Sequence, residues 1–179
     1  MSAPPSTPPL PALLDILSAL TRADIRASLG ASALLHALGL CETVRDWDLT
    51  TDAPADRVRA ALDRFDFETI GPNSIFETEA MFRVRHAGAS IDVMCRFAIR
   101  HESGIFVVPT EPAGEWHGVP LASAAAWAAA YAIMGREERA ALLFRHLAAR
   151  GVACDEFERL LLLSLPERVL RRLDAVITG

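Results

Sequence analysis

The sequence predicts an α+β fold class with a helical C-terminal part. Strand-forming residues dominate positions 67–108, whereas the composition becomes rich in alanine, leucine and charged residues after Gly114. With 179 residues, 51% of them hydrophobic, the chain can bury a substantial core. We divide it into a proline-rich, disordered tail (1–9), a core (10–114) and a helical part (115–179) that packs on the core.

Helical and strand patterns alternate through the first part of the core. Apolar spacing predicts a helix over residues 10–20, and a short strand is expected at 24–29. A second helix follows at 32–38 and ends at Gly39, because glycine commonly terminates helices. The alternating residues 44–52 then predict a strand.

A third helix and a hairpin are expected next. Asp52 is the predicted N-cap of this third helix, and Pro54 fits the first turn of the helix. Apolar residues recur at i, i+3, i+4 and i+7 from Val58. Further along, we expect a hairpin that joins residues 75–86 to 90–100, with turn residues between them.

Four helices are expected after Gly114. They cover residues 121–134, 136–150, 157–163 and the segment from Ser164, which opens with a capping-box match. In so short a chain these amphipathic helices need the sheet to bury their apolar faces, so we expect them to form one wall of a substrate cleft. The side chains expected in this packing are Trp127, Tyr131, Leu143 and Leu147, and Arg136 and Arg139 are candidate substrate contacts.

The strand at 44–52 carries two carboxylates, Asp46 and Asp48. Side chains alternate between the faces of a strand, so both carboxylates project from one face while Trp47 and Leu49 enter the core. Two like charges so close are costly unless a positive charge lies between them. Mg²⁺ prefers oxygen ligands and often takes one or two carboxylates plus substrate phosphates. The pair predicts a metal and phosphate site, with an ordinary surface pair as the alternative.

Two further motifs support this interpretation. Gly30, Ala31 and Ser32 precede a helical run, where glycine lets the backbone approach a ligand and the helix start offers N–H groups to a phosphate. Asp92 lies in an alternating strand at 90–97 whose other face is apolar. A third carboxylate on a neighbouring strand would complete a two-metal site for phosphoryl transfer. The structural alternatives are an ordinary turn glycine and a solvated aspartate on an edge strand.

In this order, the three motifs resemble those of the nucleotidyltransferase superfamily, which includes DNA polymerase β, the CCA-adding enzymes and the aminoglycoside nucleotidyltransferases. The run from Asp46 to Ala53 is particularly similar to the CCA-adding enzymes, in which a D-x-D strand enters a turn that contains Thr and Asp. The resemblance covers about residues 24–98. It implies a nucleotidyltransferase-like mixed sheet flanked by helices.

The resemblance also implies a metal-dependent transferase that moves a nucleoside monophosphate from an NTP to an acceptor. In the implied mechanism Asp46 and Asp48 hold two Mg²⁺ (or Mn²⁺) ions, and Asp92 joins them at the ion that activates the attacking group. The turn at 30–32 would bind the nucleotide phosphates through backbone N–H groups. The chain lacks the long helical region of the CCA-adding enzymes, so a small molecule or a protein is the expected acceptor rather than tRNA.

Two departures from the family pattern keep other classes of function open. Ala31 stands where the family usually has Gly or Ser, and no Arg follows Ser32. These departures favour a non-catalytic nucleotide- or partner-binding protein that retains the fold, whereas three clustered acids favour an enzyme. An antitoxin-like member that modifies a partner protein is a third alternative.

Composition excludes several other classes. No apolar run reaches the ~18–20 residues of a membrane span, and no basic region precedes an apolar one at the N-terminus. We therefore expect a cytoplasmic protein without a membrane partner. Three scattered cysteines indicate neither a disulfide framework nor a zinc site. The net charge of −5 argues against a nucleic-acid partner. Every basic residue is Arg, so any side-chain contact to phosphate must use guanidinium groups.

Overall fold

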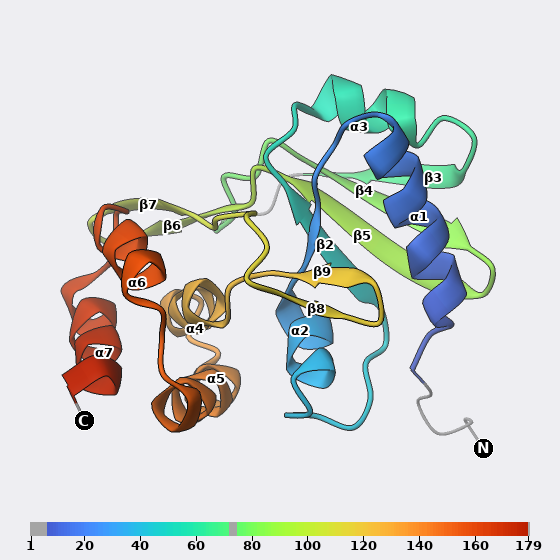
Figure 1. Cartoon of the computed structure of the whole chain (residues 1–179). Helices are drawn as coiled ribbons and strands as arrows, with labels where there is room; N and C mark the ends of the chain where they lie inside the picture. Colours follow the sequence, from blue (N-terminus) through green and yellow to red (C-terminus); the bar gives the residue numbers. More distant parts are fainter. Residues whose placement is uncertain (1–6, 72–74, 179) are drawn as a thin grey trace, which may run out of the picture.

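The computed structural model describes residues 7–71 and 75–178 and has a mixed α+β architecture (Figure 1). Its elements are, in chain order, α1 (Leu10–Arg22), β1 (Ser28–Leu29), α2 (Ala31–Ala37), β2 (Trp47–Thr51), α3 (Ala55–Ala61), β3 (Asp66–Ile70), β4 (Ala80–His86), β5 (Ala89–Cys95), β6 (Ala98–His101), β7 (Gly104–Val107), β8 (Gly114–Trp116), β9 (Val119–Leu121), α4 (Ala124–Ile133), α5 (Glu137–Arg150), α6 (Cys154–Leu161) and α7 (Glu167–Thr178). Most of the tail predicted at 1–9 lies outside the described residues.

A seven-stranded mixed sheet forms the centre of the molecule, in the order β3-β4-β5-β2-β1-β9-β8. β2 runs parallel to β5, and β1 runs parallel to β9, whereas the other neighbours are antiparallel. Figure 1 shows α1 lying across β4 and β5, and α4 to α7 grouped beyond the other side of β2. None of the helices in the described part of the chain has the length and apolar character that a membrane crossing needs.

The two central strands alternate as the sequence predicts. Trp47 is the register partner of Ile91, and Leu49 is the partner of Val93; all four side chains are buried. The intervening residues of β2 and β5 therefore project from the opposite face of the sheet. This alternation gives the sheet one apolar face under α1 and one face that carries carboxylates.

Besides the strand expected at 44–52, which covers only Trp47–Thr51 and leaves Asp46 in the preceding bend, two strand boundaries differ from the prediction. The strand expected at 24–29 is only two residues long, and the hairpin expected to reach residue 100 ends at Cys95. Arg96 causes this second difference, because it adopts a left-handed φ of 51° that breaks the extended backbone. The chain then resumes at Ala98 as β6, which pairs with β7 in a separate two-stranded sheet.

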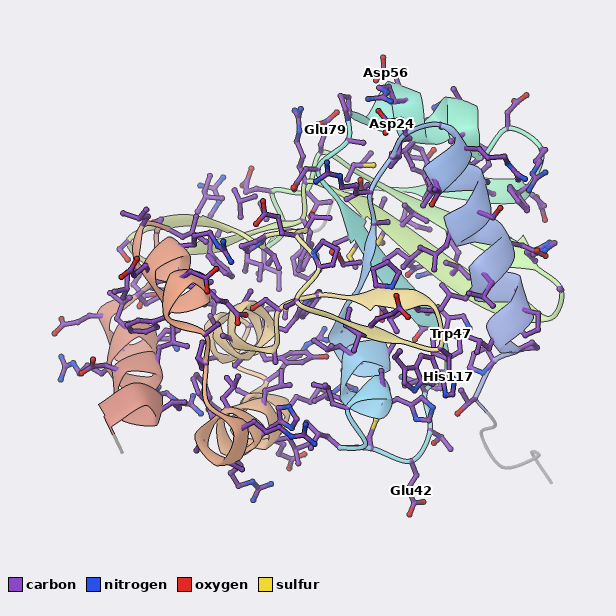
Figure 2. The ribbon with its side chains drawn as sticks, in the orientation of Figure 1. Asp24, Glu42, Trp47, Asp56, Glu79 and His117 are labelled. Atoms are coloured by element: carbon purple, nitrogen blue, oxygen red, sulfur yellow. The ribbon has the colours of Figure 1, made fainter. Side chains whose placement is uncertain are left out.

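A second hairpin, β8–β9, was not expected from the sequence. It joins the sheet because β9 pairs with β1 through Leu29 and Leu121. Its Trp116 packs 6.1 Å from Trp47 and 5.6 Å from His36, measured between ring centroids. Figure 2 shows Trp47 and His117 at this end of the hairpin. The aromatic contacts close the end of the sheet beside α2.

Several predicted helix starts are also displaced: the helix expected at 157–163 covers Cys154–Leu161, and the last helix begins at Glu167 rather than near Ser164. The first C-terminal helix begins at Ala124 rather than at 121, and Ser123 is its N-cap, with its Oγ accepting a hydrogen bond from Ala126 N–H at 2.9 Å. Asp52 does not cap α3, which begins at Ala55. The Asp52 carboxylate instead accepts a hydrogen bond from Thr110 Oγ1 at 2.9 Å.

Trp127 joins the helical part to the sheet. Its ring stacks on Phe97 with 5.5 Å between centroids and 15° between planes. The other side chains expected in this packing, Tyr131, Leu143 and Leu147, are buried too. At Gly30 the indole is so near that a Cβ atom would lie 2.4 Å from it. The glycine is therefore required by close packing between the turn and α4.

Replacing Gly30 tests this contact. The Gly30→Ala variant should lose about 1–3 kcal/mol of unfolding free energy, because the buried Trp127 ring cannot move aside without disturbing the core. Urea unfolding measures the change. Gly114→Ala is the matched control, since an added Cβ there meets nothing within 4 Å. Equal stability of Gly30→Ala and the wild type would contradict this account.

Candidate active site

Four charged residues form a row across one face of the sheet. Glu68 on β3 is the register partner of Arg83 on β4, Arg83 is the partner of Asp92 on β5, and Asp92 is the partner of Asp48 on β2. Register partners on adjacent strands lie side by side on the same face. The row therefore brings Asp48 and Asp92 together, as the sequence predicts, but it places an arginine directly beside Asp92.

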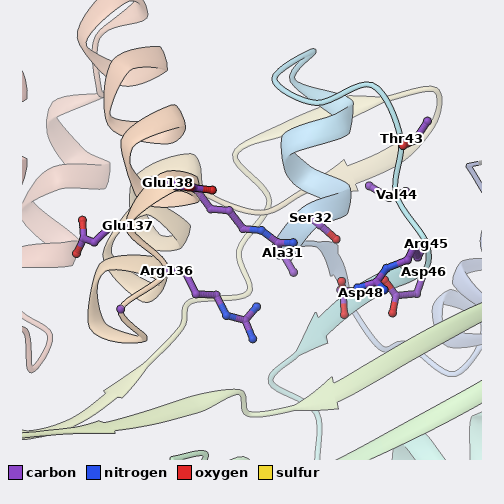
Figure 3. Close-up of a pocket in the computed structure, with 12 residues that line it drawn as sticks. Ala31, Ser32, Thr43, Val44, Arg45, Asp46, Asp48, Arg136, Glu137 and Glu138 are labelled. Atoms are coloured by element: carbon purple, nitrogen blue, oxygen red, sulfur yellow. The ribbon is translucent and has the colours of Figure 1, made fainter. Parts of the chain in front are cut away.

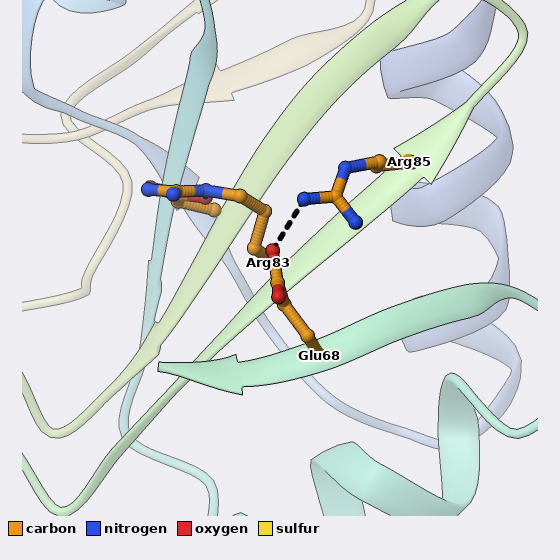
Figure 4. Close-up of polar contacts among 4 residues, drawn as sticks. Glu68, Arg83 and Arg85 are labelled. Carbon is orange, nitrogen blue, oxygen red and sulfur yellow. Dashed lines mark hydrogen bonds and ion pairs between the residues drawn. The ribbon is translucent and has the colours of Figure 1, made fainter. Parts of the chain in front are cut away.

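Arg83 binds Asp92 with two parallel hydrogen bonds. Its Nε and Nη2 atoms donate to the two carboxylate oxygens of Asp92, each at 2.8 Å. The Asp92 side chain is 8% exposed and that of Arg83 is 35% exposed. Figure 4 shows Arg85 of β4 bound to Glu68 of β3, with Arg83 extending away from them. Both oxygens of the third predicted carboxylate are thus engaged by a guanidinium.

Asp48 and Asp46 have a different environment. Neither carboxylate forms a hydrogen bond or an ion pair with any of the described residues, and both line a cavity of about 780 Å³. Burial, together with the negative charges of Asp46 and Asp92, raises the pKa of Asp48 to about 8. Two acidic side chains without an ion-pair partner among the described residues therefore lie at this end of the row.

Cationic side chains face the two carboxylates across the cavity. Arg136 and Arg139 come from the start of α5 and lower the pKa of Asp48 through their charges, which opposes the effect of burial. Figure 3 shows Arg136 on one wall, with Asp46 and Asp48 on the other. The helical part therefore contributes a wall of this cavity, with the two arginines named from the sequence on it.

The small-residue turn lies at the cavity edge. Gly30 N–H donates to the backbone oxygen of Asp48 at 2.8 Å, which fixes the turn to β2. Ala31 and Ser32 line the cavity, but Gly30 is not among its lining residues. Ala31 has a left-handed φ of 49°, a conformation that costs a non-glycine residue about 1–2 kcal/mol. Backbone strain of this kind is found at functional sites.

A second cavity adjoins the first and was not expected from the sequence. It measures about 900 Å³ and shares Ala31, Asp48 and Arg136 with the first cavity. Apolar and aromatic side chains supply much of its lining: Phe76, Met81, Met94, Phe97, Trp127 and Met134. Asp48 therefore lies where a polar chamber meets a more apolar one. The alternation in β4 and β5 could have indicated Met81 and Met94, which share a face with Arg83 and Asp92.

The carboxylates fit a metal only in part. Among the described residues, no three His, Cys, Asp or Glu side chains lie close enough together to hold a metal ion. Asp46 and Asp48 present carboxyl oxygens that form no ion pair with a described residue, and oxygen ligands of this kind suit a hard divalent cation. Asp92 does not fit in the same way, because both of its oxygens bind Arg83.

The raised pKa of Asp48 predicts how stability depends on pH when no metal is present. The folded state binds the Asp48 proton up to a pKa of about 8, whereas the unfolded state releases it near the ordinary aspartate pKa of 3.8. This group therefore makes the protein progressively less stable as the pH rises through that interval. Asp48→Asn cannot ionise and should unfold at a higher temperature than the wild type at pH 8 in EDTA.

Thermal unfolding between pH 5 and pH 8.5 provides the measurement. The advantage of Asp48→Asn over the wild type should grow with pH, while the exposed control Asp63→Asn should follow the wild type. Parallel curves for Asp48→Asn and the wild type would show that Asp48 is ionised in the folded state at neutral pH.

Comparison with known proteins places this geometry in a structural context. No protein-family model and no curated protein matches the chain. Among solved structures, a candidate nucleotidyltransferase from Thermotoga maritima aligns with a TM-score of 0.52 and 19% identity, over 75% of this chain and 89% of its own.

Two structures of the antibiotic-resistance factor ANT(2″)-Ia also match. The one in complex with adenylyl-2″-tobramycin has a TM-score of 0.55 and 16% identity, over 92% of this chain and 94% of its own. The solution structure gives 0.54 and 16%, over 91% of this chain and 88% of its own. Such identities establish similarity of fold, and they agree with the motifs and the mixed sheet: the chain shares the fold of these solved nucleotidyltransferase structures.

Proposed function

We propose that the protein transfers a nucleoside monophosphate from an NTP to a small-molecule acceptor. One observation carries the proposal: Asp46 and Asp48 form no ion pair with any described residue and face Arg136 and Arg139 across one cavity. A metal–triphosphate has the complementary distribution of charge, with a cation for the carboxylates and anionic phosphates for the arginines. The nucleotidyltransferase fold supports this interpretation.

Asp46 and Asp48 would hold the divalent cation, Mg²⁺ or Mn²⁺. When bound, such an ion neutralises phosphate charge and stabilises a leaving pyrophosphate. Arg136 and Arg139 bind the phosphates from the opposite wall, as a chain without lysine requires. Backbone N–H groups of the turn at Ala31 and Ser32 supply further contacts to phosphate.

The more apolar cavity is the proposed acceptor site. It adjoins Asp48 and Arg136, so an acceptor bound there reaches a phosphate held between them. Its two other carboxylates are already paired, Glu79 with Arg96 and Asp92 with Arg83. ANT(2″)-Ia, whose structure contains adenylyl-2″-tobramycin, is a neighbour with a small-molecule product. A cavity of about 900 Å³ suits a small molecule better than a protein surface.

The Arg83–Asp92 pair favours a second candidate, a nucleotide-binding protein of this fold without activity. It removes one of the three carboxylates on which the catalytic interpretation from sequence depends. Incubation with each of the four NTPs and Mg²⁺, followed by measurement of pyrophosphate, separates the two candidates. Each incubation also contains an extract that supplies candidate small-molecule acceptors. An enzyme releases pyrophosphate when its acceptor is present. A protein that only binds nucleotide releases no pyrophosphate with any extract, and its NTP stays intact.

Removing one carboxylate charge tests the metal site. Asp46→Asn should lower NTP affinity at least tenfold in Mg²⁺ without changing the fold, because the half-buried side chain keeps its size but loses a charged ligand. Isothermal titration with and without Mg²⁺ measures this effect, and Asp63→Asn is the exposed control. Wild-type NTP binding that is independent of divalent cations would refute the metal site.

The arginine wall gives a separate prediction. Arg136→Gln and Arg139→Gln should each weaken NTP binding about 10- to 100-fold, the amount expected for a lost hydrogen bond to a charged group. Binding of the corresponding nucleoside should change little, because it has no phosphate. Arg145→Gln, exposed on the same helix, is the matched control. Equal losses for nucleoside and NTP would place these arginines elsewhere in the site.

A further inference from the structure

The surroundings of Arg83 indicate a functional role for this residue. It projects from the middle of β4 between two acidic register partners, Glu68 and Asp92. Glu68 is bound by Arg85 at 2.5 Å, so Arg83 is left to Asp92 alone. The pairing is bidentate and two-thirds buried on the arginine side, which makes it much more specific than a surface ion pair.

A guanidinium in this position neutralises Asp92 permanently. Arg is charged at every pH that a protein tolerates, and it cannot be removed by a chelator. Both Asp92 oxygens lie 2.8 Å from its nitrogens, so the guanidinium occupies one lone-pair direction on each oxygen and offsets the negative charge that would attract a second cation. Breaking this pair would leave the buried Asp92 carboxylate without its partner, which is strongly unfavourable.

Arg83 also faces the reaction space. Arg83, Asp92 and Asp48 all line the second cavity. The Nε and Nη2 atoms that bind Asp92 form one edge of the guanidinium, so Nη1 remains outside that pair. The same group can therefore hold Asp92 with one edge and offer positive charge to a bound anion with the other.

We propose that Arg83 takes the place of a second divalent cation: it neutralises Asp92, and the chain binds a single metal ion per nucleotide, at Asp46 and Asp48. This inference rests on the proposed function. Arg83 acts as a positioning residue for Asp92 and as a fixed positive charge at the edge of the acceptor cavity. The row then contains one fixed cation and one exchangeable cation where the family pattern implies two exchangeable ions.

The test counts metal ions. The full chain is saturated with the non-hydrolysable analogue α,β-methylene-ATP, or with the corresponding analogue of whichever NTP binds, and titrated with Mn²⁺, whose free form is measured by electron paramagnetic resonance. The expected result is one bound Mn²⁺ per complex. Two bound ions in the wild type would overturn the proposal while leaving nucleotide binding, and so the proposed function, intact. Failure of every NTP analogue to bind would overturn both.

Variants of Arg83 sharpen the count. Arg83→Gln removes the fixed charge from Asp92, so the complex should take up a second Mn²⁺, whereas Arg83→Lys retains a charge and should still bind one. Arg85→Gln is the matched control, on the same strand and face but paired with exposed Glu68, and it should bind one. A folded Arg83→Gln that still binds a single ion would overturn the proposal. If this variant does not fold, the wild-type count decides.

Discussion

The parallel pairing of β2 with β5 is the constraint on which the site depends. Its register sets Asp48 beside Asp92, and two neighbouring carboxylates at a partly buried position repel each other. The antiparallel pairing of β4 with β5 places Arg83 on the other side of Asp92 and offsets that charge. Strand register therefore decides which carboxylate of the row is paired: Asp92 binds Arg83, and Asp48 has no ion-pair partner among the described residues.

The contact between Gly30 and Trp127 fixes the second wall of the site relative to the first. Gly30 N–H is bonded to the Asp48 carbonyl, and the Trp127 indole lies against the same glycine. The turn, β2 and α4 are thus joined at one point, only a few residues from the carboxylates. Because α4 leads directly into α5, this packing also sets the distance between Arg136 and Asp48. A glycine that the sequence associates with phosphate binding has, in the structure, a packing role.

The sequence predicted which side chains share a face of one strand, but it did not predict how neighbouring strands are aligned with each other. The period-two pattern correctly predicted that Asp48 and Asp92 project from the face opposite to Trp47 and Ile91. The partner of Asp92 depends on how β4 is aligned with β5, and nothing in one strand's pattern specifies that alignment. Arg83 was missed for this reason. The β8–β9 hairpin was missed because its stability comes from distant contacts, such as the Trp116 packing on Trp47, rather than from local propensity.

The Arg83 guanidinium and the Asp48 carboxyl respond differently to pH. Asp92 raises the pKa of Arg83 above its already high value, so this cation is permanent. Asp48 binds a proton near neutral pH, since burial raises its pKa to about 8. On the proposed function a divalent ion must displace that proton, so metal binding would release protons and would strengthen with rising pH. On the proposed function, the pH dependence of metal binding therefore resides at Asp48.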